Sequence, residues 1–189
     1  MPSSIDISSL DRWVTQARSR RGAMLCIRPL RRDDRDREIA FINSLSDRSR
    51  YFRLFTPSKF LPRNLIDQLM DIDYRQRMAF VATTQQSGIE QFVGVARYCE
   101  TDDAGIAELG ICVADAWQRS GIASLLIQQL ICYAREQGIR RLIGLVLPDN
   151  QAMIALARRL AFTVSYEPAQ HLFQMSRELD APATSQVAA

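Results

Sequence analysis

The residues that point most directly to chemistry lie between an apolar stretch, residues 107–113, and a long amphipathic stretch, residues 121–137. The first stretch alternates as a strand does, and the second carries apolar side chains at helical spacing. A small-residue loop that enters a helix leaves backbone N–H groups without partners at the positive end of the helix dipole, where phosphate binds. The loop residues expected to hold a phosphate are Gln118, Arg119, Ser120, Gly121, Ile122, Ala123 and Ser124.

Two other phosphate-binding loops are excluded by their motifs. The loop lacks the GxxxxGK[ST] pattern of a P-loop and the GxGxxG pattern of dinucleotide-binding folds. The remaining alternative is a plain strand-to-helix turn in which Gly121 supplies only a tight bend.

A single carboxylate, Glu108, lies within the apolar stretch that precedes the loop. A carboxylate in a partly apolar setting is a candidate general base, because its pKa can rise toward neutrality. Alternation with a period of two places Glu108 on one face of the expected strand, together with Gly110 and Cys112. The alternative is a solvated glutamate at a strand end, close to the acids of the preceding turn.

The cysteines and the histidine argue against two further chemistries. The four cysteines are scattered through apolar segments without a CxxC pair, so they are expected to be buried, reduced thiols. They are Cys26, Cys99, Cys112 and Cys132. His171 is the only histidine, which gives a metal site nothing to build on, so no metal is expected. An acyl-cysteine at Cys112 is disfavoured because no histidine accompanies it, and a structural thiol is favoured.

Length and composition limit the class of protein. A chain of 189 residues is most simply one domain that can bury a sizeable core. No apolar run reaches the ~18 residues that span a bilayer. The first residues also lack the apolar segment of a signal peptide, so no membrane partner and a cytoplasmic location are expected. The net charge of +3 is too small to indicate nucleic acid as a partner.

Periodicity along the chain predicts an α/β domain with a mixed sheet. Strands are expected at residues 24–30, 78–84, 92–99, 107–113, 141–147, 162–165 and 171–175. Helices are expected at residues 33–42, 62–70, 121–137 and 150–160. Residues 48–53 fit either the rim of an acceptor site or an ordinary helix with aromatics inward and arginines outward. The domain is expected to span residues 23–178, between a flexible or loosely helical extension, 1–22, and a flexible tail, 179–189.

The pattern Gln118-x-x-Gly121-x-Ala123 resembles the Q/R-x-x-G-x-G/A motif of the GCN5-related N-acetyltransferase (GNAT) family. This resemblance implies one GNAT-fold domain with a splayed, mostly antiparallel sheet flanked by helices, and acetyl-CoA as cosubstrate. It implies that residues 118–124 hold the pyrophosphate and that pantetheine pairs between the strands ending at Val113 and Leu147. The other residues that it places in the cofactor site are Ile111, Cys112, Val113 and Asn150. A backbone N–H in the region 111–113 is expected to stabilise the oxyanion.

Other segments are similar to the catalytic domain of Pat-type protein lysine acetyltransferases, among them residues 27–30, 49–55 and 148–160. The match implies that Glu108 is the catalytic base. Many GNAT members carry a tyrosine seven residues after the asparagine, as the acid for the leaving thiolate, and here that position is Ala157. Thiolate protonation is then left to solvent or to another group, with Tyr98 and Tyr166 as weak candidates.

The expected activity is transfer of an acetyl group from acetyl-CoA to a primary amine by direct attack, with a protein lysine ε-amine as the first choice. Such an amine has a pKa near ~10.4 and must lose a proton before it attacks, which gives Glu108 its role. Two alternatives stay open, a small-molecule amine as acceptor and a non-catalytic acyl-CoA-sensing module. A homodimer is also left open.

Overall fold

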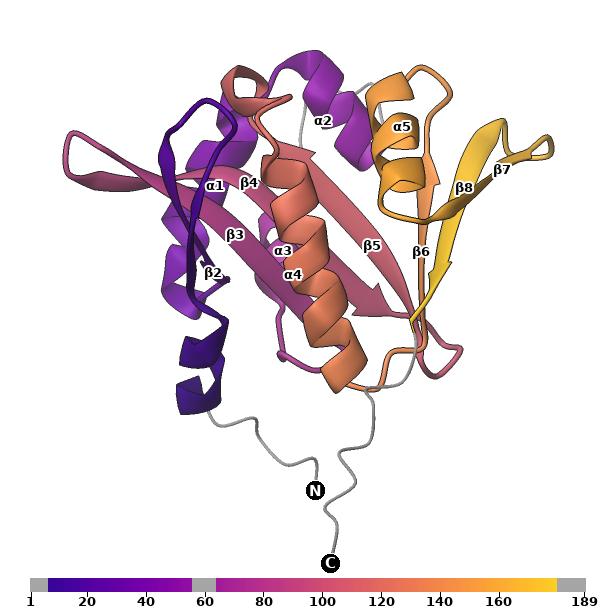
Figure 1. Ribbon diagram of the computed structural model, residues 1–189, viewed down its shortest axis with the longest axis horizontal. Helices are drawn as coiled ribbons and strands as arrows, with labels where there is room; N and C mark the ends of the chain where they lie inside the picture. Colours follow the sequence, from indigo (N-terminus) through magenta and orange to yellow (C-terminus); the bar gives the residue numbers. More distant parts are fainter. Residues whose placement is uncertain (1–6, 56–63, 180–189) are drawn as a thin grey trace, which may run out of the picture.

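The computed structural model describes residues 7–55 and 64–179, which form one eight-stranded sheet with helices on both faces (Figure 1). The strands are β1 (Thr15–Arg18), β2 (Met24–Pro29), β3 (Arg77–Gln86), β4 (Ile89–Glu100), β5 (Ile106–Val113), β6 (Arg141–Val146), β7 (Thr163–Glu167) and β8 (Leu172–Glu178). The α-helices are α1 (Arg35–Ser44), α2 (Asp47–Leu54), α3 (Leu65–Met70), α4 (Ile122–Glu136) and α5 (Gln151–Arg159). Three short 3-10 helices are η1 (Ile7–Trp13), η2 (Arg32–Asp34) and η3 (Asp115–Trp117).

The strands follow the order β1-β2-β3-β4-β5-β6-β8-β7 across the sheet. All neighbouring strands are antiparallel except β5 and β6, which are parallel. These two strands pair only from Ile106, opposite Arg141, to Glu108, opposite Ile143. Beyond Glu108 they diverge, although both continue for several residues. The predicted α/β domain with a mixed, mostly antiparallel and splayed sheet is therefore confirmed.

Helices cover the two faces of the sheet unequally (Figure 1). The long helix α4 crosses the front of β3, β4 and β5 and buries Leu126 and Leu130 against them. Behind the sheet lie α1 and α3, which are tied to β4 where Arg97 donates to Glu38 and to the Leu69 carbonyl. α5 packs on the other side of the splay, over β6 and β7. The splay between β5 and β6 thus separates two packed halves of the domain.

Within the expected flexible or loosely helical extension, the described residues begin with the 3-10 helix η1, but the residues after it differ from the expectation. Residues 15–18 form β1, which pairs with β2 as an edge strand of the sheet. Trp13 is buried between Phe80 and Tyr133, with ring centroids 6.0 and 5.0 Å apart. β1 is short and polar, so its own periodicity is too weak to indicate a strand; it is defined by its pairing with β2.

Other expectations are corrected or fall outside the described residues. The cysteines are free but not buried, because Cys99 and Cys132 are exposed and Cys26 and Cys112 are half-buried. The predicted start of a helix at Pro62 and residues 180–189 of the predicted tail lie outside the described residues, whereas Leu179, the first residue of that tail, is buried. Every strand and helix expected from residue 24 onward occurs, with α2 in addition. Within the described residues, no helix is both long and apolar enough to cross a membrane.

A buried ion-pair network joins β2 to the start of α1. The Arg28 guanidinium donates to both carboxylate oxygens of Asp34, at 2.6 and 2.8 Å, and also to Glu90. Arg28 and Asp34 have only 3% and 1% of their side chains exposed. Burial alone would raise the pKa of Asp34, but hydrogen bonds from Arg28 and the Arg31 backbone, together with nearby arginine charges, lower it. This carboxylate therefore stays ionised inside the fold.

Candidate active site

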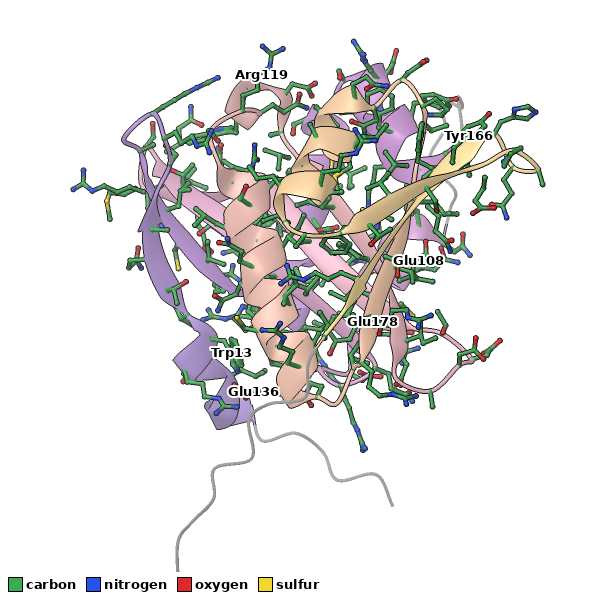
Figure 2. The ribbon with its side chains drawn as sticks, turned by 45° about the vertical axis from the view of Figure 1, so that its right-hand side comes forward. Trp13, Glu108, Arg119, Glu136, Tyr166 and Glu178 are labelled. Carbon is green, nitrogen blue, oxygen red and sulfur yellow. The ribbon has the colours of Figure 1, made fainter. Side chains whose placement is uncertain are left out.

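A groove of about 850 Å³ passes through the splay between β5 and β6. One side is lined by α2 and the exposed end of β4, and the other by α5 and the ends of β6 and β8. The loop before α4 closes one end, and Glu108 lies toward the other. Figure 2 shows Arg119 at the top of the molecule, with Glu108 well below it near the middle of the sheet. The predicted anion loop and the predicted base thus line one continuous groove.

The open edge of β5 presents backbone groups to this groove. The Ala114 N–H donates to Val93 of β4, and the Gly105 carbonyl accepts from Arg140 and Arg141 on the side of β6. Since backbone groups alternate along a strand, Ile111 and Val113 turn their N–H and C=O groups toward β6. After Glu108 no pairing to β6 uses these groups. The strand edge can therefore pair with an extended ligand.

The loop before α4 has the geometry of an anion site. Gly121 is the N-cap of α4 with φ of +90°, a conformation that favours glycine, and Arg119 has φ of +59°. The first N–H groups of an α-helix lack intrahelical partners, and Gly121 has no side chain that could cap those of α4. Ser120 is fully buried, and its hydroxyl donates to the Trp117 carbonyl. Ser120 therefore shapes the loop from inside, while the backbone from Gly121 onward faces the groove.

Gln118 braces the loop with its side chain. Its amide nitrogen donates to the Ser49 hydroxyl at 3.0 Å and to the Val113 carbonyl at 3.3 Å. The Asp115 carboxylate binds the start of α2, where it accepts from the Ser46 N–H at 2.9 Å and from the hydroxyls of Ser46 and Ser49. Burial would raise the pKa of Asp115, but these hydrogen bonds lower it. These hydrogen bonds tie α2 to the loop. The Gln118 backbone N–H also donates, to the Asp115 carbonyl at 3.3 Å, so a phosphate contact by Gln118 stays a prediction.

Glu108 points to the face of the sheet that carries α1 and α2. Its side chain is exposed, and Gly110, two residues further on, shares that face. A Cβ built on Gly110 would lie 3.0 Å from the Arg53 guanidinium carbon, so the absence of a side chain lets Arg53 rest on the strand. The expectation that the arginines of residues 48–53 point outward is therefore wrong for Arg53. The Arg53 guanidinium thus lies on Gly110, two residues along β5 from the predicted base.

The family model described as the acetyltransferase (GNAT) domain matches residues 24–163. The chain belongs to this family. It is 39% identical over 158 residues to Acetyltransferase PA5475 of Pseudomonas aeruginosa, a match that covers 84% of each chain. It is 30% identical over 142 residues to Acetyltransferase Pat of Mycolicibacterium smegmatis, covering 75% of this chain and 42% of Pat.

A solved structure supports the same relationship. The GNAT domain of S. lividans PAT superposes with a TM-score of 0.80 at 29% identity, covering 89% of this chain and 98% of that domain. The predicted family and the likeness to Pat-type enzymes are thus confirmed. The chain is an acetyltransferase, and its cosubstrate is acetyl-CoA.

Arg97 and Glu38 form a buried ion pair beneath the groove between β5 and β6. The guanidinium donates to Glu38 at 2.7 Å, and Arg97 lies opposite Gly110 on β4. Burial lowers the pKa of Arg97 to about 10, against the opposing effect of the Glu38 charge. Burial likewise raises the pKa of Glu38, although Arg97 and Arg53 oppose it. This ion pair lies inside the domain, whereas the Glu108 carboxylate is exposed.

Cys112 lines the GNAT groove, yet its chemistry is unsuited to carrying an acyl group. Burial raises the pKa of its thiol to about 12, so the thiol stays protonated at neutral pH and is a poor nucleophile. We therefore expect no acyl-enzyme after incubation with labelled acetyl-CoA. The measurement is hydroxylamine treatment of the labelled protein, which releases thioesters and leaves amides intact. Hydroxylamine-labile label on Cys112 would contradict this expectation.

The two tyrosines considered for protonating the thiolate lie away from the groove. Tyr98 is buried, and its hydroxyl donates to the Arg75 carbonyl at 2.8 Å. Tyr166 lies on β7 and interacts with His171 Nδ1 at 3.2 Å, well apart from Glu108 (Figure 2). Ala157, at the position of the family's tyrosine, is fully buried. Thiolate protonation by solvent or by a group other than these two tyrosines stays a prediction.

Asn150 begins α5 as predicted, with its Oδ1 accepting from the Met153 N–H at 3.2 Å. It lines the groove, so its amide nitrogen is the part left for a ligand. The sequence did not indicate two other lining arginines, Arg20 and Arg159, whereas Arg53 lies in the stretch that was considered as an acceptor-site rim. Arg159 of α5 donates to the hydroxyl of Ser124, on α4, at 3.3 Å. A basic residue late in α5 and a basic turn before β2 are the local signals that could have suggested these two arginines.

Proposed function

We propose that this protein transfers the acetyl group of acetyl-CoA to lysine ε-amines of proteins, with Glu108 as the general base. The observation that carries the proposal is the loss of β5–β6 pairing directly after Glu108. It leaves an open strand edge that leads from the anion loop to Glu108.

The donor binds along this edge in the proposal. The pyrophosphate lies on the backbone N–H groups of residues 118–124, at the N-terminus of α4. Pantetheine extends along Val113 and Ile111 as an added strand, with Cys112 and Asn150 beside it. At ~3.3 Å per residue, the five steps from Val113 to Glu108 span roughly 16 Å, the scale of an extended pantetheine arm. The thioester is then near Glu108.

The reaction follows from this placement. The acceptor ammonium gives a proton to Glu108, directly or through a water, and the neutral amine attacks the thioester carbonyl carbon. A C–N bond forms, and the oxyanion is stabilised by a backbone N–H in residues 111–113. The attacking nitrogen loses its second proton to solvent, the C–S bond breaks, and solvent protonates the thiolate. Glu108 returns its proton to solvent, so the products are an amide, free CoA and one proton.

The acceptor end of the groove favours the side chain of a protein. Glu108 is exposed, so an amine on a long flexible stem reaches it from solvent without any opening of the domain. Arg53 of α2 lines the groove and lies on Gly110, two residues along β5 from Glu108. Its charge repels a polycation, which disfavours polyamines among the small-molecule alternatives. A single lysine side chain brings one charge, which Glu108 neutralises by taking the proton.

The acceptor is tested by incubating the protein with labelled acetyl-CoA, once with a cell lysate and once with a panel of amino acids, polyamines and amine antibiotics. We expect label in protein bands, resistant to hydroxylamine, and none in the small-molecule fraction. Boiled enzyme controls for spontaneous acetylation. Label in a small amine would reassign the acceptor, and binding of acetyl-CoA without transfer to any amine would indicate a sensing module.

A further inference from the structure

The hairpin that joins β1 to β2 is attached to the anion loop. The Arg20 backbone N–H donates to the Ser120 carbonyl at 2.7 Å. The Arg21 guanidinium donates to the carbonyls of Ala116 at 2.7 Å and Gln118 at 3.2 Å. In Figure 1 the tip of this indigo hairpin reaches the loop before α4 at the top of the view. The β1–β2 hairpin, which is far from the anion loop in the sequence, thus packs directly against that loop.

The hairpin turn itself has a defined geometry. The Ser19 N–H donates to the Ala23 carbonyl at 2.9 Å, and the Ala23 N–H donates back to the Ser19 hydroxyl at 3.1 Å. Ser19 is buried, and Gly22 adopts φ of +85° at the bend. The turn therefore holds Arg20 in one place relative to the loop, so the position of its side chain is set by the fold.

The side chain of Arg20 crosses the N-cap of α4. A Cβ built on Gly121 would lie 3.3 Å from Arg20 Cγ and 3.5 Å from Arg20 Nε. Arg20 lines the groove, and within residues 7–55 and 64–179 no ion pair engages it. Its guanidinium lies beside the backbone N–H groups that face the groove, where a second positive group strengthens the attraction for an anion.

We propose that Arg20 binds the acetyl donor, acetyl-CoA, by contacting its diphosphate. The β1–β2 hairpin holds the Arg20 guanidinium over Gly121 for this contact. This inference rests on the proposed position of the donor. Arginine suits the role because its fork of N–H donors matches two phosphate oxygens at once. The diphosphate is favoured over the 3′-phosphate because Gly121 marks the N-terminus of α4, where the loop amides converge.

Arg20→Ala tests the side chain alone, because alanine keeps the backbone N–H that binds Ser120. Three ligands separate the contributions: acetyl-CoA, 3′-dephospho-acetyl-CoA and S-acetyl-pantetheine, with Kd measured by calorimetry. We expect Arg20→Ala to raise the Kd of the first two about tenfold, equally, and to leave that of the third unchanged. The increase in Kd should become smaller at higher salt concentration, because salt screens the attraction between the Arg20 guanidinium and the diphosphate. The melting temperature without ligand should stay at the wild-type value.

Arg18→Ala is the matched control, since Arg18 is an exposed arginine on β1 of the same hairpin and does not line the groove. It should leave all three dissociation constants unchanged. An unchanged Kd for acetyl-CoA in Arg20→Ala would overturn the inference, as would an equal loss for S-acetyl-pantetheine. A loss for acetyl-CoA but not for the 3′-dephospho form would overturn the diphosphate assignment. Failure of the wild-type protein to bind any of the three would instead overturn the proposed donor site.

Discussion

Glu108→Gln is expected to lower kcat by a factor of about 10²–10⁴ while the Kd for acetyl-CoA stays nearly unchanged. Glutamine keeps the shape and polarity of the side chain but cannot accept the proton of the acceptor ammonium. Glu108 is exposed, so the substitution leaves the packing of the sheet intact. The measurement is steady-state kinetics with the acceptor identified by labelling, together with calorimetric titration of acetyl-CoA.

A pH series separates loss of a base from a structural defect. As the pH approaches the acceptor pKa of ~10.4, more of the amine is already neutral, so the variant should recover activity relative to wild type. Asp102→Asn, in the exposed turn before β5, is the matched control and should keep wild-type kcat. Undiminished turnover by Glu108→Gln would remove Glu108 from the mechanism, and a deficit that is constant across pH would assign it a merely structural role.

Asp34→Ala is expected to lower the free energy of unfolding by about 3–5 kcal/mol. The substitution leaves the Arg28 guanidinium buried with only Glu90 to neutralise it, and a buried charge without its main partner is costly. Urea denaturation followed by circular dichroism measures the change. The control is Glu178→Ala, which breaks the exposed pair with Arg141 and should cost less than about 1 kcal/mol. Equal costs for the two variants would contradict the importance of burial.

The same carboxylate is expected to make stability depend on pH. The pKa of Asp34 is lower in the folded protein than in the unfolded chain, so its contribution is fully present above the unfolded value of ~3.9. The contribution is lost as the pH falls from that value through the folded pKa. Asp34→Asn should therefore flatten the loss of stability below about pH 4. An acid unfolding curve as steep as that of wild type would show that other carboxylates dominate.

Local pattern predicted the elements that carry the site. The strand at 107–113, the turn at Gly121 and the helix at 121–137 each depend on residues within a few positions of one another, and all three occur. The GNAT family was evident from the same segment. α2 was left undecided because its arginines and aromatics suit either a rim or a helix, and it turned out to be a helix that lines the groove.

The prediction was weakest for the N-terminal segment. β1 is four residues long with a mostly exposed pattern, so nothing in its own sequence marks it as a strand. Its pairing with β2, and the burial of Trp13 against Phe80 and Tyr133, depend on partners much later in the chain. Residues of the expected extension therefore join the core, and Arg20 is carried to the loop with them.

By itself the sequence determined the family, the order of most elements, the anion loop around Gly121 and the candidate base Glu108. Each of these depends on short-range periodicity or on a contiguous motif. The tertiary structure alone decided where β5 and β6 part and which arginines face the groove. Arg53 reaches Gly110 because that residue has no side chain, and Arg20 reaches Gly121 because a hairpin is bonded to Ser120. Both contacts join residues far apart in the chain, and only the packing of the sheet brings them together.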